Sequence, residues 1–170
     1  MTQTPGEDRS VTFTWADPAG PLALLPEMAG LAYLEAVRDG QVPRPPIAAV
    51  MQLELREVEP GRVEFLGQPT EAHFNPLGTI HGGYACTALD TAVGCAVHTL
   101  LDAGTGYTSI DLNVSYLRPI LPSSAPLRII GRVTKPGTRV TFAEAQITDS
   151  AGVLVATATS ALLILRPPAS

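Results

Sequence analysis

The sequence predicts an α+β fold in which a six-stranded antiparallel sheet wraps around one long central helix. The first observation is a run of helical length, residues 84–101, that is apolar almost throughout. The second is that two segments of alternating apolar and polar residues precede this run and four follow it. A helix that is apolar on all sides must be covered on all sides, and strands before and after it can form one sheet that curls around it.

Residues 1–45 form an N-terminal arm rich in proline, glycine and polar residues. Within the arm, residues 27–40 have apolar side chains at helical spacing and end at a glycine, which predicts one short helix. The following "QVPRPP" is an extended connector, because proline restricts both itself and its predecessor. We expect the helix to pack on the outside of the domain as scaffold, with residues 1–25 as a loose arm.

The expected sheet-and-helix domain comprises residues 46–166. Residues 52–68 alternate around the turn "EPGR", which predicts a hairpin. After the helix, residues 106–120 predict one long strand, and the turns "KPGT" and "DSAG" separate the last three, at residues 125–135, 139–149 and 153–166. The expected common face of the first of these four strands is Thr108, Ile110, Leu112, Val114 and Tyr116.

Length and composition restrict the class of protein. The chain has 170 residues, 45% of them hydrophobic and only 16% charged, which favours one folded domain over a disordered chain. A net charge of −5 argues against nucleic acid as a partner, because nucleic acids bind basic surfaces. A small anion held by a few arginines is still compatible with that charge.

The two cysteines, Cys86 and Cys95, lie nine positions apart in the apolar helix, on opposite faces, so they cannot pair with each other. This usage fits a reducing compartment, and the first ten residues show no basic region followed by an apolar core, as a secretory signal would. Asp90 and His98 within the apolar run argue against a membrane helix. We therefore expect a cytoplasmic protein with no membrane partner.

Asp90 interrupts the apolar helix and needs a reason. Burying an unpaired carboxylate is costly, so such a group shifts its pKa or finds a partner. Asp90 either lies on an exposed stripe, bonds a neighbouring backbone donor, or lines a pocket. We favour the pocket, because the residues expected on the same helix face are mostly small: Gly83, Cys86, Thr87, Gly94 and Val97.

The start of the helix is a second candidate feature, with His81, Gly82 and Gly83 in "GTIHGGY". The first backbone N–H groups of a helix have no internal partner and carry the positive end of its dipole. Glycine lets a ligand approach them, so such a terminus can bind an anion or stabilise a developing oxyanion. A tight turn is an alternative reason for two adjacent glycines.

The spacing of the two features predicts how the chain assembles. Gly82 and Asp90 are eight residues apart, roughly 12 Å along a helix, and an Asp side chain recovers only a few Å of that. One carbonyl group can hardly contact both residues of one helix. Two antiparallel copies related by a two-fold axis would bring Gly82 of one chain beside Asp90 of the other, so we expect a homodimer with two shared sites.

The segments "NPLGTIHGGYACTALDTAVG" and "YTSIDLNVSYLRPI" resemble hotdog-fold acyl-CoA thioesterases of the phenylacetate-pathway (PaaI-like) family. The resemblance covers roughly residues 46–165. It consists of an Asn, a His-Gly-Gly six positions later, an Asp nine after the His, and a strand ending in aromatic-x-Arg-Pro. The resemblance implies a hotdog fold, dimers paired into a homotetramer, and an acyl-CoA substrate with no separate cofactor, since coenzyme A enters and leaves with the reactants.

The resemblance also implies roles for single residues. Asp90 would be the catalytic carboxylate, acting as general base on water or as a nucleophile that forms a mixed anhydride. The Gly82 N–H would polarise the thioester carbonyl, Asn75 would hold substrate or water, and His81 would orient the site without acting as a base.

The substrate side of the site is expected around these four residues. Ser109 matches the hydroxyl residue that assists the acid in some members, with Thr108 as the alternative if the register shifts. Gly83 and Thr87 leave room beside the carboxylate. The phosphates of coenzyme A could contact a basic residue, although solvated strand ends explain these residues equally well: Arg118, Arg132, Lys135 and Arg139.

Other functions fit the sequence less well. No G-x-S-x-G motif of an α/β-hydrolase occurs, and the histidine and cysteine spacings match no metal-binding motif. A hotdog hydratase pairs a histidine with an acid at another spacing. A non-catalytic module that binds an acyl-CoA or an aromatic ligand remains the alternative, because a fold does not fix a function.

Overall fold

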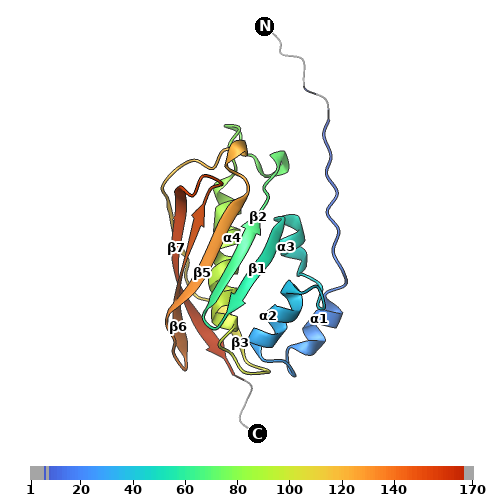
Figure 1. The fold of residues 1–170 in the computed structure, drawn as a ribbon, viewed down its shortest axis with the longest axis vertical. Helices are drawn as coiled ribbons and strands as arrows, with labels where there is room; N and C mark the ends of the chain where they lie inside the picture. The colour runs from blue at the N-terminus through green and yellow to red at the C-terminus, as the bar shows by residue number, and fades with distance from the viewer. Residues whose placement is uncertain (1–5, 7, 167–170) are drawn as a thin grey trace.

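The apolar run forms a helix, α4 (Gly82–His98), which lies against the concave face of one curved antiparallel sheet (Figure 1). The architecture comes from a computed structural model that describes residue 6 and residues 8–166; residues 1–5 and 7 of the expected arm, and 167–170, lie outside the described residues. Half of α4 is buried against the sheet, and most of these residues are small: Tyr84, Ala85, Ala88, Leu89, Ala92, Val93, Gly94, Ala96 and Val97.

The sheet confirms the predicted α+β class and the hairpin before the helix. Its order is β1-β2-β5-β6-β7-β3, with β4 also paired to β7, and every pair is antiparallel. The strands are β1 (Leu53–Glu59), β2 (Arg62–Gly67), β3 (Gly106–Ser109), β4 (Asn113–Tyr116), β5 (Leu127–Lys135), β6 (Val140–Thr148) and β7 (Leu154–Leu165). Short 3₁₀ turns occur at Glu71–His73 and Pro122–Ser124.

The prediction of one strand over residues 106–120 is wrong: this segment forms β3 and β4, separated by a break at residues 110–112. At the break, Asp111 bonds β7 with its side chain, since its Oδ1 accepts from the Ala161 N–H at 2.8 Å. The break contains one residue more than the facing stretch of β7, so the alternation of inward and outward side chains changes phase across it. Tyr107 and Ser109 therefore face inward in place of Thr108 and Ile110, and both of the latter are exposed. A β-bulge re-aims side chains in this way.

Three short helices lie beside the β1 edge of the sheet: α1 (Ala19–Leu24), α2 (Gly30–Arg38) and α3 (Pro46–Val50) (Figure 1). The predicted helix is α2, which ends before Gly40 at φ 73°, where a glycine stops a helix favourably. The arm is more structured than expected, because α1 falls within residues 1–25. The start of α2 packs on the end of α4, where the Gly30 N–H donates to the Leu101 carbonyl at 2.9 Å.

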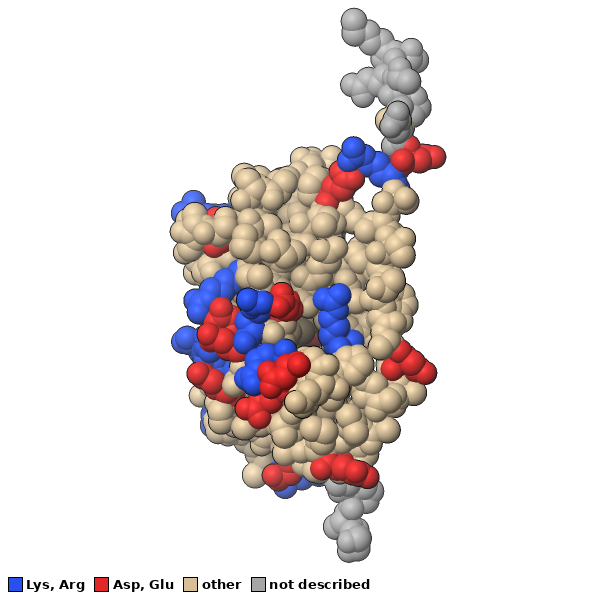
Figure 2. All heavy atoms as spheres, turned by 45° about the vertical axis from the view of Figure 1, so that its right-hand side comes forward, with Lys and Arg blue, Asp and Glu red and all other residues tan. Residues whose placement is uncertain are grey.

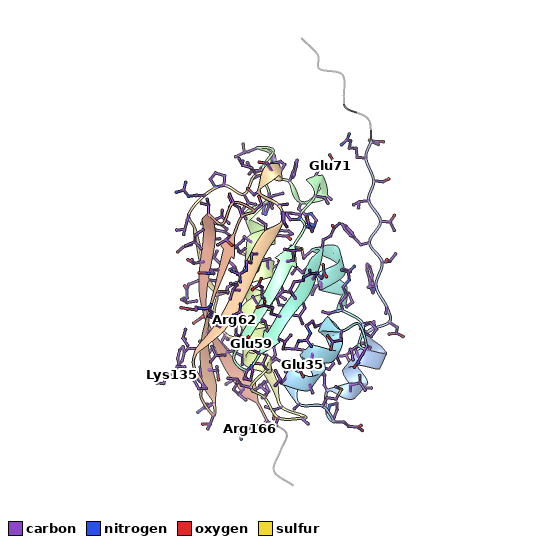
Figure 3. All side chains as sticks on the ribbon, viewed as in Figure 1. Glu35, Glu59, Arg62, Glu71, Lys135 and Arg166 are labelled. Atoms are coloured by element: carbon purple, nitrogen blue, oxygen red, sulfur yellow. The ribbon has the colours of Figure 1, made fainter. Side chains whose placement is uncertain are left out.

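The outer face of the sheet holds a group of ion pairs around Glu64. This carboxylate accepts two bonds from Arg128, at 2.7 and 2.6 Å, and one from Arg62 at 3.0 Å. The hydrogen bonds from Arg128, followed by the charges of both guanidinium groups, lower the pKa of Glu64. Arg62 also approaches Glu59 across the β1–β2 turn (Figure 3), so this end of the hairpin is fixed by charge as well as by its ladder.

Neither thiol forms a disulfide, as expected: Cys86 and Cys95 are both free. His98 is partly buried. Across the described ranges, 6 and 8–166, no helix combines the length and hydropathy that a bilayer span needs.

Gly131 permits the close approach of β5 to α4. A Cβ at this position would lie 2.2 Å from the backbone oxygen of Ala92, so Gly131→Ala forces the strand and the helix apart. We expect the free energy of unfolding, measured in urea, to fall by about 2 kcal/mol or more, as for an overpacked core. The control is Gly20→Ala, where no atom lies within 4 Å; equal stability of the two variants would contradict this account.

Burial of His98 makes stability depend on pH. Burial lowers the pKa of this imidazole, so the unfolded chain binds a proton more readily than the folded chain. The stabilisation is present above the unfolded pKa of about 6.5 and is lost as pH falls through the folded pKa. In His98→Gln, the slope of unfolding free energy between pH 7.5 and 5 should become shallower, by up to about 1.4 kcal/mol per pH unit. If urea titrations of His98→Gln gave the same pH dependence of the unfolding free energy as the wild type, this role of His98 would be contradicted.

Candidate active site

Asp90 lies midway along α4, with its side chain exposed in the single chain and hydrogen-bonded to Ser109. The Ser109 hydroxyl donates to Asp90 Oδ1 at 2.8 Å, and this bond orients the carboxylate. No group of the described residues bonds Oδ2, so this oxygen is free for another partner. Both groups line an open depression of ≈ 420 Å³ together with Thr87 and Ile110. In the single chain Asp90 is exposed and lies in an open depression; that this depression is the substrate pocket we favoured stays a prediction.

The depression is not shaped as the sequence suggested. The space above Gly94 is filled by the Tyr107 ring, whose Cε2 and hydroxyl oxygen would lie 2.9 Å from a Cβ at that position. At Gly83, a Cβ would lie 3.0 Å from Nδ1 of the His81 ring, so this space is filled as well. Tyr107 was missed, although it stands two residues before Ser109 and therefore shares its face in a strand.

The N-terminus of α4 is capped by His81. Nδ1 of His81 accepts from the Gly83 N–H at 2.8 Å, so in the neutral ring the proton lies on Nε2. The Gly82 N–H donates to no group of the described residues. The cap thus satisfies one of the orphan donors at this end of the helix and leaves the donor of Gly82 available.

Tyr116 closes over the same helix end and was not among the expected site residues. Its hydroxyl donates to the Gly82 carbonyl at 3.1 Å and lies 2.8 Å from Cys86 Sγ. Either atom can be the donor in this second contact. The hydrogen bond with Cys86, together with partial burial, raises the pKa of Tyr116 to about 12.

Asn75 shapes the loop that leads into α4. Its Oδ1 accepts from the N–H groups of Leu77 and Thr79, and its Nδ2 donates to the Thr79 hydroxyl at 2.7 Å. The carbonyl oxygen of the Asn75 amide is therefore used within the loop, and one N–H of the amide is left for another group.

The structure separates the four candidate cations, of which Arg139 is exposed in the connection just before β6. Arg118 lines an open depression of ≈ 340 Å³ with Gly82 and Tyr116. Arg132 lies on the outer face of the sheet, in a hollow with Glu144. Lys135 lies at the far end of β5, at the opposite end of the molecule from the start of α4 (Figures 1 and 3). Of these cations only Arg118 lines the Gly82 depression.

The remaining expected residues fall into two groups. Thr87 lines the Asp90 depression, although its hydroxyl donates to the Gly83 carbonyl at 3.0 Å. Thr108 points away from Asp90, and the alternative register that would have used it is not found. Asp90 and Gly82 belong to two separate depressions, as their spacing along one helix requires.

A single helix wrapped by one antiparallel sheet, with an oriented carboxylate at its middle and an available N–H at its start, defines the chain as a hotdog-fold protein. The family model of the thioesterase superfamily matches residues 77–156. A phenylacetic acid degradation-related protein of Ralstonia eutropha JMP134 is 30% identical, with a TM-score of 0.70 over 77% of this chain and 98% of that chain. The chain belongs to the thioesterase superfamily and is a thioester hydrolase.

Two further relatives agree with this assignment. A thioesterase family protein of Silicibacter pomeroyi is 26% identical, with a TM-score of 0.70 over 79% of this chain and 99% of its own. Human acyl-coenzyme A thioesterase 13 is 29% identical over 106 residues, which are 62% of this chain and 74% of the human protein. The resemblance to acyl-CoA thioesterases of the phenylacetate-pathway type is thus confirmed.

Proposed function

We propose that the protein hydrolyses an aromatic or medium-chain acyl-CoA thioester to the free acid and coenzyme A. The observation that carries the proposal is the exposed Asp90 carboxylate, oriented by Ser109 in an open depression. Hydrolysis of a thioester needs an oriented base or nucleophile and a donor for the oxyanion, and the Gly82 N–H at the positive end of α4 is suited to be that donor.

Two routes fit Asp90. As a general base it takes a proton from water, the hydroxide attacks the carbonyl carbon, and the C–S bond breaks as the sulfur leaves with that proton. As a nucleophile it attacks the carbonyl itself, expels the thiolate and forms a mixed anhydride that water then hydrolyses. Neither route needs a cofactor.

We further propose that each site is shared between two chains. Along one α4, Gly82 and Asp90 are roughly 12 Å apart. Three apolar side chains connect the two depressions along the free edge formed by β3 and β4 and are more than half exposed: Ile110 at 56%, Tyr116 at 54% and Leu117 at 52%. A two-fold related copy on this edge would cover all three and bring its Gly82 to the first chain's Asp90.

The position of Arg118 beside Gly82 supports a role in holding coenzyme A. A guanidinium group binds phosphate oxygens through two parallel hydrogen bonds. In this arrangement Arg118 would contact the coenzyme A of a substrate whose carbonyl lies at the Gly82 of the same chain and the Asp90 of the partner. The dimers would pair into tetramers, as the resemblance implies.

Release of free thiol from a panel of acyl-CoA esters tests the proposed activity. The panel comprises acetyl-, octanoyl-, phenylacetyl- and 4-hydroxybenzoyl-CoA. We expect turnover of at least one of the larger esters. Tight binding of an ester, measured by calorimetry, without release of thiol from any of them would instead identify a non-catalytic binding module.

A further inference from the structure

A cavity of ≈ 540 Å³ lies beneath the N-terminal helices. It occupies the gap between the two edges of the curled sheet, β1 and β3, where α2 and α3 cover the side of α4 that carries Thr91, Cys95 and His98. The cavity opens to the outside between charged side chains. Figure 2 shows a hollow whose edge carries both basic and acidic residues. The charged residues of its lining are Arg38, Arg44 and Glu54.

The interior of the cavity is apolar and uncharged. Its walls include Leu34, Val37 and Phe65, and its inner end is formed by three rings in sequence, with centroids 5.7 Å apart for Tyr33–His98 and 5.6 Å for His98–Tyr107. Burial raises the pKa of both tyrosines and lowers that of His98, so all three rings are neutral near pH 7. An ionised group would lose its hydration here without gaining a counterion.

The inner end of the cavity lies next to the Asp90 depression. Thr87 lines the depression and Thr91, one turn further along α4, lines the cavity; the Thr91 hydroxyl donates to the Thr87 carbonyl at 2.7 Å. Burial raises the pKa of Tyr107 and of Cys95, which both line the cavity, and the charge of Asp90 adds to each shift. The Tyr107 ring lines the cavity and rests on Gly94, one turn after Asp90 on α4, and is thus placed to act as a partition between the two spaces.

We propose that this cavity holds the acyl group of the substrate, and that Tyr107 is a specificity-determining residue at its entrance from Asp90. The proposal rests on the thioesterase activity proposed above. The occupant is an uncharged acyl group, aryl or aliphatic. The cavity volume falls within the roughly 300–1,000 Å³ of small-molecule sites.

In this arrangement the thioester carbonyl stays at Asp90 and the acyl group passes between Thr91 and Tyr107. The helices α2 and α3 then form part of the substrate site, where the sequence alone suggested a scaffold. Both precede residues 77–156, the part of the chain that matches the family model. Acyl preference would thus be set in part by a segment of this chain outside that match.

The test fills the cavity from α2. Val37→Phe places a ring inside it, whereas Ala32→Phe adds the same ring to the exposed side of the same helix. We expect Val37→Phe to lower kcat/KM for phenylacetyl- and octanoyl-CoA by about tenfold or more, with acetyl-CoA hydrolysis unchanged, and Ala32→Phe to match the wild type on all three esters.

A second pair of variants covers misfolding and the role of Tyr107. Thr105→Phe fills the cavity from a loop and should show the same selective loss if Val37→Phe fails to fold. Tyr107→Ala, which removes the partition, should shift the ratio of octanoyl- to acetyl-CoA hydrolysis upward. Equal loss on all esters, or no loss, in a folded filling variant would overturn the assignment of the cavity.

The two proposals can fail separately. If the wild type hydrolyses some ester but the filling variants keep its acyl preference, only the acyl site is wrong. If the wild type hydrolyses none, the proposed function is wrong. The cavity is then tested by calorimetric binding of octanoyl-CoA, which Val37→Phe should weaken and Ala32→Phe should not; equal binding, or none, overturns the inference.

Discussion

Asp90→Asn is expected to lower kcat for acyl-CoA hydrolysis by about 10³-fold, within the range for loss of a general acid or base. The amide keeps the size of the carboxylate and can still accept from Ser109, so the geometry is retained while the base or nucleophile is lost. KM should change little, because the carboxylate acts on the reacting carbonyl and contributes little to binding of the coenzyme A portion.

Thiol release under single-turnover conditions measures this effect. Asp102→Asn removes the same charge from an exposed position outside both depressions and should retain full activity. Ser109→Ala should show an intermediate loss of roughly tenfold, the value of one hydrogen bond to a charged group. Turnover at the wild-type rate in a folded Asp90→Asn protein would remove Asp90 from the mechanism.

Gly82→Pro is expected to lower kcat by about 10²- to 10³-fold, the usual cost of losing one oxyanion donor. Proline has no N–H and is well tolerated at the first position of a helix. The preceding His81 already has an extended backbone, φ −61° and ψ 139°, as a residue before proline prefers. Gly82→Ala keeps the N–H and adds the same Cβ near Tyr116, so it is the matched control. Similar activity of Pro and Ala variants would exclude this donor.

Mixing the two inactive variants tests whether the site is shared. In a dimer of one Asp90→Asn chain and one Gly82→Pro chain, one site has both intact residues and the other has neither. Random assortment should therefore restore about a quarter of wild-type activity, given two equivalent sites. Mixed chains that form dimers but stay as inactive as each variant alone would show that Gly82 and Asp90 act within one chain.

The sequence alone was sufficient for the layout of the fold. The apolar run of α4 and the alternating segments on either side are local patterns, and burial requirements alone turn them into a helix covered by a sheet. Asp90 could be found in the same way, because a carboxylate within an apolar helix is conspicuous. Ser109 was predicted only through the resemblance to the thioesterase family, since the alternation placed it on the opposite face from Thr108 and Ile110.

The break between β3 and β4 was not predictable, because it depends on a contact made far along the chain. The alternation of residues 106–120 is regular, but the Asp111 side chain bonds the backbone of β7 and shifts the phase by one residue. That shift places Tyr107 on Gly94 in place of Thr108 and Ile110. The alternation of this segment therefore predicted neither the filled space beside Asp90 nor the inward position of Tyr107, which only the placement of Ser109 two residues later could have indicated.

For this protein, the sequence by itself determined the helix, the strands around it and the carboxylate at the centre, since each follows from periodicity and the cost of burying charge. Only the tertiary structure decided that α2 and α3 close the gap between β1 and β3 and leave a cavity beside Asp90. Such a cavity depends on how closely elements distant in sequence pack, and residue type alone does not set that distance.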